Sequence, residues 1–354
     1  MKVGFLSIEN RTVELRDAKI ALFDGGHTCG PLLTISDASE IDFAIAQLKP
    51  TCEAVVVEGN VDAFYDKVKN DKAANLEVFD LDGTLYVVTK KVTADYLNNR
   101  LLPIINSKNK KRFQVIVFKT YGKTEEELKS ILKEYTKSRS KIQLGFFPGF
   151  LECEVHVRGA SNMPQTDYKA AIDKIGQALY KCTYSLDRVT IAERVAQMLT
   201  EQKLRLKLAE SFTGGAIAKE LTSVPGASEY LAEGLVTYSV TSKIKRLGVP
   251  AEAIAEKGVV SSDTAYRMAV GLLSSGDCDV AIATTGNAGP TSAQGPKGLC
   301  FIAIGNKNEV HTMKYSFDGD RDENIRRGVK NALFLLFRYL DSRETATARE
   351  TDNA

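Results

Sequence analysis

The segment from 206 to 221 constrains the fold of this chain more than any other. A short apolar strand, Leu206 to Ala209, runs into Glu-Ser-Phe-Thr-Gly-Gly (210–215), and helical spacing resumes at Ala216. A strand, a glycine-rich turn and a helix are typical of layered α/β domains, which place ligands at the carboxyl edge of the sheet. We therefore expect Ser211 at that edge, where close backbone N–H groups and the start of a helix favour an anion.

The elements around this segment alternate between strands and helices. Apolar spacing predicts helices at 190–202 and 322–340, and strands at 234–238, 279–284, 299–304 and 309–316. This interleaving predicts an α/β fold, with a mixed sheet between helices on both faces, as a three-layer domain over 186–341. The polar end of the chain, 342–354, lacks large apolar residues, and we predict that it is disordered.

Two smaller α/β domains are predicted before this one, at 1–110 and 111–185. In the first, apolar runs at 19–23, 54–57 and 83–88 indicate strands, and 41–48 has helical spacing. In the second, a strand at 113–118 precedes a helix that Thr124 and Glu127 begin as a capping box. Strands at 142–144 and 153–157 and a helix at 167–180 complete a compact layer.

A basic hexapeptide, Ser-Lys-Asn-Lys-Lys-Arg (107–112), separates these two domains. Such a run is typical of a solvated loop, and a nucleic-acid contact is the alternative. The domain at 111–185 is also of a size that can bind RNA, but it has no Gly-x-x-Gly loop with flanking basic residues. We therefore expect no nucleic-acid partner.

Charge and cysteine usage exclude several other classes of protein. A formal net charge of +2 builds no long-range field of one sign. No apolar run approaches the ~20 residues that a membrane-spanning helix needs, and the amino-terminal segment is too interrupted by charge for a secretory signal. The six cysteines include no Cys-x-x-Cys pair, and the three histidines lie far apart in sequence. We expect a cytoplasmic protein without a metal site and without a membrane partner.

The Ser211 segment has two interpretations. It can be a helix N-cap with a tight turn, or Ser211 can be a nucleophile, which needs a base to take its proton. None of the three histidines has a suitable neighbourhood. The alternative base is Lys243, which we predict to lie one turn into the helix after Tyr238. Burial would lower the pKa of this lysine, because it disfavours the charged ammonium. The opposing interpretation is that Lys243 is a solvated helix residue, as its neighbours Lys245 and Arg246 indicate.

A series of motifs carries a family resemblance. The segment Ala-Glu-Ser-x-Thr-Gly-Gly (209–215) is followed by Val-Pro-Gly-Ala-Ser (224–228), Gly-x-Val-Thr-Tyr-Ser (234–239) and Lys243. Leu-Gly-Val (247–249), Gly-Val-Val-Ser (258–261), Thr-Gly-x-Ala-Gly-Pro (285–290) and Gly-Asp-Arg (319–321) come next. This ordered set closely resembles the carboxy-terminal domain of the competence-damage-inducible protein A (CinA) family. The same domain exists alone as nicotinamide-nucleotide amidase.

The resemblance implies an amidohydrolase that needs no cofactor. It would convert nicotinamide mononucleotide to nicotinate mononucleotide and ammonia, with Ser211 as nucleophile, Lys243 as general base and Tyr238 as an assisting hydroxyl. Backbone donors near Thr213, Gly214 and Gly215 would stabilise an oxyanion. Substrate phosphate would bind the helix start after Ser211 and the turn that contains Thr285, Gly286, Ala288 and Gly289, with Arg321 as a partner. The alternatives are that the turn at 285–290 is a plain strand-to-loop connection and that Arg321 is a solvated residue at a helix start.

Several positions depart from the family pattern. Phe212 stands where a Cys is usual, Val240 and Thr241 replace an Asn and a Glu, and Asn287 replaces an apolar residue. The stretch 291–298 also lacks the usual Gly-Gly and Lys-Pro order. These changes leave open a non-catalytic nucleotide-binding or scaffolding protein that kept the fold.

The amino-terminal part also resembles the family's longer form. There, a domain of the kind found in molybdenum-cofactor biosynthesis proteins precedes a small middle domain. Residues 1–110 would be a shortened, degenerate version, because Val-Glu-Gly-Asn-Val-Asp (57–62) occupies the place of the Gly-Gly-x-Gly-Pro phosphate loop. We expect this domain to serve in assembly, and the protein to be a homo-oligomer.

Overall fold

The computed structural model describes residues 1–9, 15–68, 77–107, 113–136, 141–291 and 295–352. The chain forms two compact units, Met1–Lys181 and Cys182–Ala354. Both are built from β-sheets and helices, which confirms the α/β fold class. The predicted division at residue 110 stays a prediction, and residues 108–112 of the predicted basic loop lie outside the described residues.

A five-stranded sheet forms the first part of unit 1. Its order is β2 (Thr28–Ile35), β1 (Lys2–Ile8), β3 (Ala54–Glu58), β5 (Thr84–Thr89), β4 (Val78–Leu81), and only the β4–β5 pair is antiparallel. One face packs against η1 (Ala38–Glu40), α2 (Ile41–Leu48) and α3 (Val61–Val68). The other face packs against α1 (Leu15–Asp24) and the helical run of α4 (Ala94–Tyr96), η2 (Leu97–Leu101) and α5 (Leu102–Ser107).

The strand predicted at 19–23 is wrong, because these residues belong to helix α1. A short apolar run fits a buried strand and one side of a helix equally well. Here Ala18, Ala21 and Leu22 are the buried positions, which is the three-and-four spacing of a helix face. The strands predicted at 54–57 and 83–88 and the helix predicted at 41–48 are confirmed as β3, β5 and α2.

The second part of unit 1 is an antiparallel layer. Strand β8 (Glu152–Gly159) lies between β7 (Ile142–Pro148) and β6 (Val115–Tyr121). Helices α6 (Glu125–Ile131) and α7 (Gln165–Leu179) accompany these strands. The predicted capping box is confirmed: Thr124 Oγ1 accepts from Glu127 N at 3.2 Å, and the Glu127 carboxylate accepts from Thr124 N at 2.8 Å.

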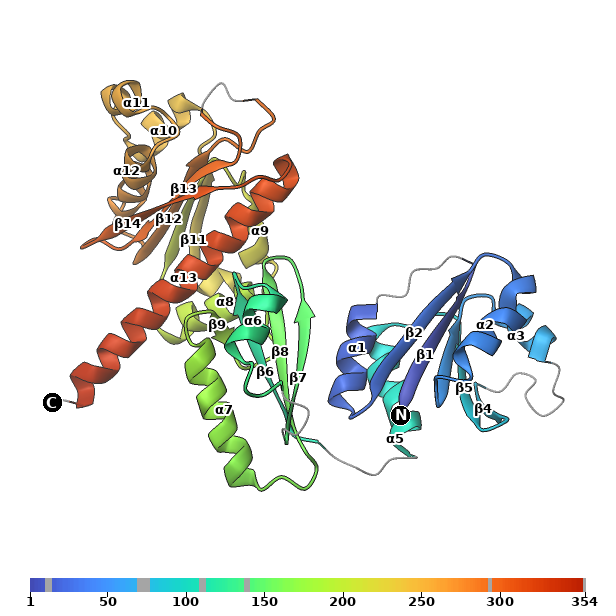
Figure 1. Ribbon diagram of the computed structural model, residues 1–354. Coiled ribbons are helices and arrows are strands. Elements are labelled where there is room, and N and C mark those ends of the chain that lie inside the picture. The colour runs from blue at the N-terminus through green and yellow to red at the C-terminus, as the bar shows by residue number, and fades with distance from the viewer. Residues whose placement is uncertain (10–14, 69–76, 108–112, 137–140, 292–294, 353–354) are drawn as a thin grey trace. The chain divides into compact units, whose positions relative to one another are not determined.

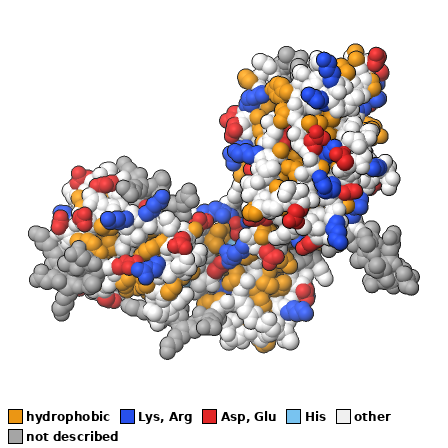
Figure 2. All heavy atoms as spheres, turned by 180° about the vertical axis from the view of Figure 1, so that it is seen from behind, with side chains coloured by type: hydrophobic (Ala, Val, Ile, Leu, Met, Phe, Trp, Pro, Cys, Tyr) orange, Lys and Arg blue, Asp and Glu red, His pale blue; other side chains and the backbone are white. Residues whose placement is uncertain are grey.

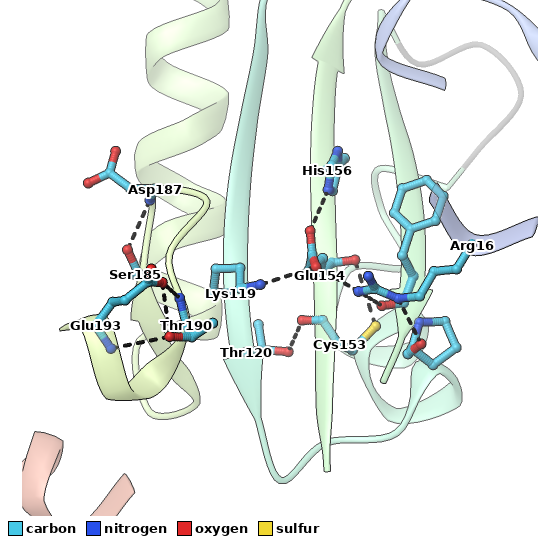
Figure 3. A network of polar contacts seen from close by, with 12 residues as sticks. Arg16, Lys119, Thr120, Cys153, Glu154, His156, Ser185, Asp187, Thr190 and Glu193 are labelled. Carbon is cyan, nitrogen blue, oxygen red and sulfur yellow. Dashed lines mark hydrogen bonds and ion pairs between the residues drawn. The ribbon is translucent and has the colours of Figure 1, made fainter. Parts of the chain in front are cut away.

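Glu154 on β8 is the centre of a polar network (Figure 3). Its Oε1 accepts from Arg16 Nη2 at 2.6 Å and from Lys119 Nζ at 3.1 Å. Its Oε2 lies 3.1 Å from His156 Nε2. Burial acts to raise the pKa of Glu154, but hydrogen bonds from His156, Arg16 and Lys119 outweigh it and hold that pKa well below its usual range. The carboxylate is therefore ionised and joins α1 to the β6–β8 layer.

Unit 2 contains the predicted mixed sheet. After β9 (Thr183–Ser185), the order is β11 (Leu231–Val236), β10 (Leu206–Glu210), β12 (Val280–Gly286), β13 (Leu299–Gly305), β14 (Val310–Ser316). Strand β10 is parallel to both of its neighbours, whereas β13 and β14 are antiparallel additions. All five residues of β10 are buried, so it is the central strand that leads to the Ser211 turn.

Helices cover both faces of this sheet, which confirms the three-layer arrangement (Figure 1). On one face, α12 (Ser262–Leu273) lies with α10 (Val240–Leu247) and α11 (Ala251–Lys257) over an apolar core. On the other, α13 (Arg321–Asp352) packs with α8 (Ile191–Glu201) and α9 (Ala216–Thr222). A short 3-10 turn, η3 (Ala227–Glu229), precedes β11. No described helix is long and apolar enough to span a membrane.

The predicted disorder of 342–354 is corrected for residues 342–352, which continue helix α13. Apolar spacing ends near Leu340, but the following Ala, Arg and Glu residues are good helix formers, and no Gly or Pro interrupts them. Residues 353–354 lie outside the described residues.

Candidate active site

Ser211 lies in the turn that joins β10 to α9. Its N–H donates to the Thr284 carbonyl of β12 at 3.0 Å, and its side chain is buried. Gly214 and Gly215 follow with φ values of 62° and 98°, a left-handed conformation that glycine adopts without strain. The turn thus needs its two glycines, and the serine is held against the neighbouring strand.

The segment that carries Lys243 is attached to the same turn. Thr237 N donates to the Glu210 carbonyl at 2.9 Å, just beyond the end of β11. Ser239 then caps α10, because its hydroxyl accepts from Ser242 N at 3.1 Å. Lys243 is in the first turn of that helix, as the sequence predicts.

Lys243 points inward and contacts the nucleophile candidate. Its Nζ lies 2.9 Å from Ser211 Oγ and donates to the carbonyls of Thr237 at 2.7 Å and Tyr238 at 3.3 Å. The side chain is 0% exposed, so the solvated interpretation of Lys243 is wrong. Burial lowers the pKa of Lys243 to about 8, because the interior disfavours the charged ammonium. An amine with such a pKa can act as a base near neutral pH.

A cavity of about 490 Å³ opens beside this pair. Its lining is Ser211, Phe212, Tyr238, Ser239, Val240, Lys243, Val259, Val260, Thr285, Gly286, Asn287, Ala288, Gly289, Thr291 and Arg321. None of these lining residues is a carboxylate, whereas Lys243 and Arg321 are basic. The cavity therefore suits a small molecule that carries negative charge.

Asn287 organises the loop on one side of the cavity. Its Nδ2 donates to the carbonyls of Thr291 at 2.6 Å and Gly295 at 2.8 Å, and its Oδ1 accepts from Gly289 N at 2.9 Å. An apolar residue could make none of these bonds. The departure from the family pattern at Asn287 thus has a structural role. Residues 292–294 of the rewritten stretch lie outside the described residues.

Arg321 and Tyr238 meet at the rim of the cavity. Arg321 donates through Nη1 to the Gly289 carbonyl and through Nη2 to the Tyr238 hydroxyl at 3.1 Å. The Tyr238 side chain is 63% exposed, and it is its backbone carbonyl that contacts Lys243. Thus the rim presents a guanidinium and a phenol to a ligand, and the phenol hydroxyl is directed to Arg321.

The structure brings most of the sequence-predicted site residues together. Ser211, Tyr238, Lys243, Thr285, Gly286, Ala288, Gly289 and Arg321 all line the cavity. Thr213, Gly214 and Gly215 are not among its lining residues. Thr213 Oγ1 is instead 2.9 Å from Thr284 Oγ1 in the interior.

The expectation that the start of α9 binds phosphate is corrected, because Glu210 already occupies it. The Glu210 carboxylate accepts from the N–H groups of Gly215 at 2.9 Å, Ile217 at 3.1 Å and Ala218 at 2.8 Å. Sequence reasoning missed this role. An acidic residue that ends a buried strand beside a glycine-rich turn was the available signal.

Phe212 fills the space between the Ser211 turn and helix α13. It is buried, and its ring lies 6.2 Å from that of Phe317, centroid to centroid. A Cβ added at Gly328 of α13 would lie 2.7 Å from the Phe212 ring. The Phe212 ring therefore fits at this position because residue 328 of α13 is a glycine.

Among the described residues, no group of His, Cys, Asp and Glu side chains could hold a metal ion.

Comparisons with known proteins find relatives of this chain. Residues 188–340 match the CinA C-terminal domain family. A CinA-like protein of Geotalea uraniireducens is 36% identical over 234 residues, 64% of this chain and 56% of that protein. A putative competence-damage inducible protein of Caldicellulosiruptor bescii is 35% identical over 241 residues, 67% of this chain and 59% of that protein. The chain thus spans less than two thirds of the length of these relatives.

Solved structures are also similar to this chain. A CinA superfamily protein from Klebsiella pneumoniae is 31% identical, with 43% of this chain and 96% of that chain covered and a TM-score of 0.42. The competence/damage inducible protein CihA of Agrobacterium tumefaciens is 37% identical, with 43% and 93% covered and a TM-score of 0.41. From the domain match and the relatives together, this chain belongs to the CinA family, through a carboxy-terminal domain at residues 188–340.

Proposed function

We propose that the carboxy-terminal domain hydrolyses the carboxamide of nicotinamide mononucleotide to nicotinate mononucleotide and ammonia. The observation that carries this proposal is the position of Lys243 Nζ, buried and 2.9 Å from Ser211 Oγ. A neutral amine has two N–H bonds and one lone pair. The two carbonyls of Thr237 and Tyr238 can take the N–H bonds, which leaves the lone pair for the Ser211 hydroxyl proton.

The reaction then proceeds in two stages. Lys243 takes the proton of Ser211 as Oγ attacks the carboxamide carbon, and the resulting ammonium gives that proton to the leaving nitrogen. Ammonia departs, and the acyl group stays on Ser211 as an ester. Water then attacks the ester carbon and loses one proton to Lys243, which gives it to Ser211 Oγ as the bond between Oγ and the acyl carbon breaks. The product is released as the carboxylic acid and ionises in solution. One water is consumed, and the dyad is regenerated.

The remaining groups of the cavity have separate parts in this proposal. Because Glu210 saturates the start of α9, we assign the oxyanion to the amide of Phe212, which directly follows the nucleophile and lines the cavity. The substrate phosphate is assigned to Arg321 and the loop at 285–289 on the other side of the cavity. Tyr238, whose hydroxyl accepts from Arg321, would orient that guanidinium.

The test is ammonia release from nicotinamide mononucleotide by the purified chain. We expect release by the native protein and its loss in Ser211→Ala and Lys243→Ala. Lys245→Ala is the matched control, because Lys245 is on the same helix but exposed. Binding of the nucleotide without ammonia release by the native chain would refute the amidase and favour the non-catalytic alternative.

We also propose that residues 1–110 have lost nucleotide chemistry and serve in assembly. At the end of β3, where a phosphate loop would lie, the Glu58 carboxylate is buried and accepts from Val92 N at 2.8 Å and from Ser7 Oγ at 3.3 Å. An internal carboxylate there repels an anionic ligand. Tight molybdopterin or nucleotide binding by residues 1–110 would overturn this proposal.

A further inference from the structure

The carboxylate of Glu210, one residue before the proposed nucleophile, binds only the backbone of the following turn in the contacts that the structure describes. Oε2 accepts from Gly215 N and Ile217 N, and Oε1 accepts from Ala218 N at 2.8 Å. The side chain is 1% exposed. N–H groups at a helix start have no acceptor within the helix, so this one side chain satisfies three of them.

Glu210 also connects the two halves of the proposed dyad. Through its side chain it holds residues 215–218, which follow Ser211. Through its carbonyl it accepts from Thr237 N, in the segment whose own carbonyl binds Lys243 Nζ. The turn between these attachments contains two left-handed glycines, whose backbone has wide conformational freedom in the absence of such bonds.

We propose that Glu210 is a positioning residue, an internal carboxylate that holds the turn 211–215 so that Ser211 Oγ stays within reach of Lys243 Nζ. This inference rests on the proposed function of that pair. Misplacement of a nucleophile slows the chemical step, whereas the proposed phosphate contact, Arg321, lies at the start of α13. Loss of the carboxylate should therefore lower kcat and leave KM nearly unchanged.

The experiment compares the native full-length chain with Glu210→Gln and Glu193→Gln. Glu193 is the matched control, because its carboxylate accepts from Thr190 N at 2.6 Å at the start of α8 and lines no part of the cavity. Three quantities are measured: the melting temperature, kcat and KM for ammonia release, and the rate at which a fluorophosphonate probe labels Ser211.

We expect Glu210→Gln to lower both kcat and the labelling rate at least about tenfold, with KM within about twofold of native. Glu193→Gln should keep native kinetics even where its melting temperature falls. A folded Glu210→Gln with native kcat and labelling rate would overturn the inference. Labelling needs no amide substrate, so native protein that is labelled but releases no ammonia refutes the proposed substrate and still tests Glu210. Native protein that is not labelled refutes the dyad and this inference together.

Amide hydrogen exchange on the native chain covers the case in which Glu210→Gln does not fold. The N–H groups of Gly215, Ile217 and Ala218 should exchange slowly, as hydrogen-bonded amides do. Exchange of these three at the rate of an open turn would overturn the inference.

Discussion

The protonation of Lys243 should set the rate of the reaction between pH 7 and pH 9. With a pKa of about 8, about one tenth of the amine is neutral at pH 7 and about nine tenths at pH 9. Only the neutral form can take the Ser211 proton. We therefore expect kcat for nicotinamide mononucleotide to rise about tenfold over this interval and to level off above it.

The assay is initial-rate ammonia release in buffers of constant ionic strength, with Ser211→Ala as the blank. The interval starts at pH 7 because phosphate monoesters lose their second proton near pH 6, which would change substrate binding at lower pH. Lys243→Arg should be inactive throughout, since a guanidinium remains protonated. A native rate that is constant between pH 7 and pH 9 would refute the assignment of Lys243 as the base.

Three further predictions follow from the same contacts. Because burial lowers the pKa of Lys243 from 10.5, the folded protein binds fewer protons there than the unfolded chain. The free energy of unfolding of the native protein, relative to that of Lys243→Met, should therefore rise by about 2 kcal/mol between pH 7 and pH 9.5 in denaturant titrations. A constant difference would contradict the lowered pKa of the buried amine. Arg321→Ala should raise KM for the mononucleotide about 10- to 100-fold, and hardly change KM for the riboside that lacks the phosphate; equal effects on both would place the phosphate elsewhere. Gly328→Ala should cost about 1–3 kcal/mol by overpacking against the Phe212 ring, and nothing in a Phe212→Cys background; additive effects in this double-mutant cycle would disprove the contact.

Local signals in the sequence predicted much of the fold. Thr124, followed three residues later by Glu127, marks a helix start that the structure confirms as a capping box. The structure shows a second capping box at Thr190 and Glu193, which was not predicted. The strand at 19–23 was wrong because five residues are too few for apolar spacing to distinguish a strand from a helix. The end of α13 was placed too early because apolar spacing reports burial, whereas a helix can continue on intrinsic propensity alone.

The candidate site shows where sequence reasoning stops. Strand and helix patterns could place Ser211 after a strand and Lys243 in the second α-helix after that strand. The distance of 2.9 Å between their side chains depends on the pairing of β10 with β11, which these patterns do not give. The sequence signal at Glu210, an acidic residue that ends a buried strand beside a glycine-rich turn, did not fix its role, because that pattern is equally consistent with an exposed side chain. Similarly, Asn287 reads as a lost apolar residue until its three hydrogen bonds within the loop are known.

The bond between Thr237 N and the Glu210 carbonyl has a consequence for the timing of assembly. It continues the pairing of two parallel strands by one step, so the proposed nucleophile and base are joined as soon as those strands pair. The chain without a ligand should accordingly already hold Ser211 Oγ and Lys243 Nζ within contact distance.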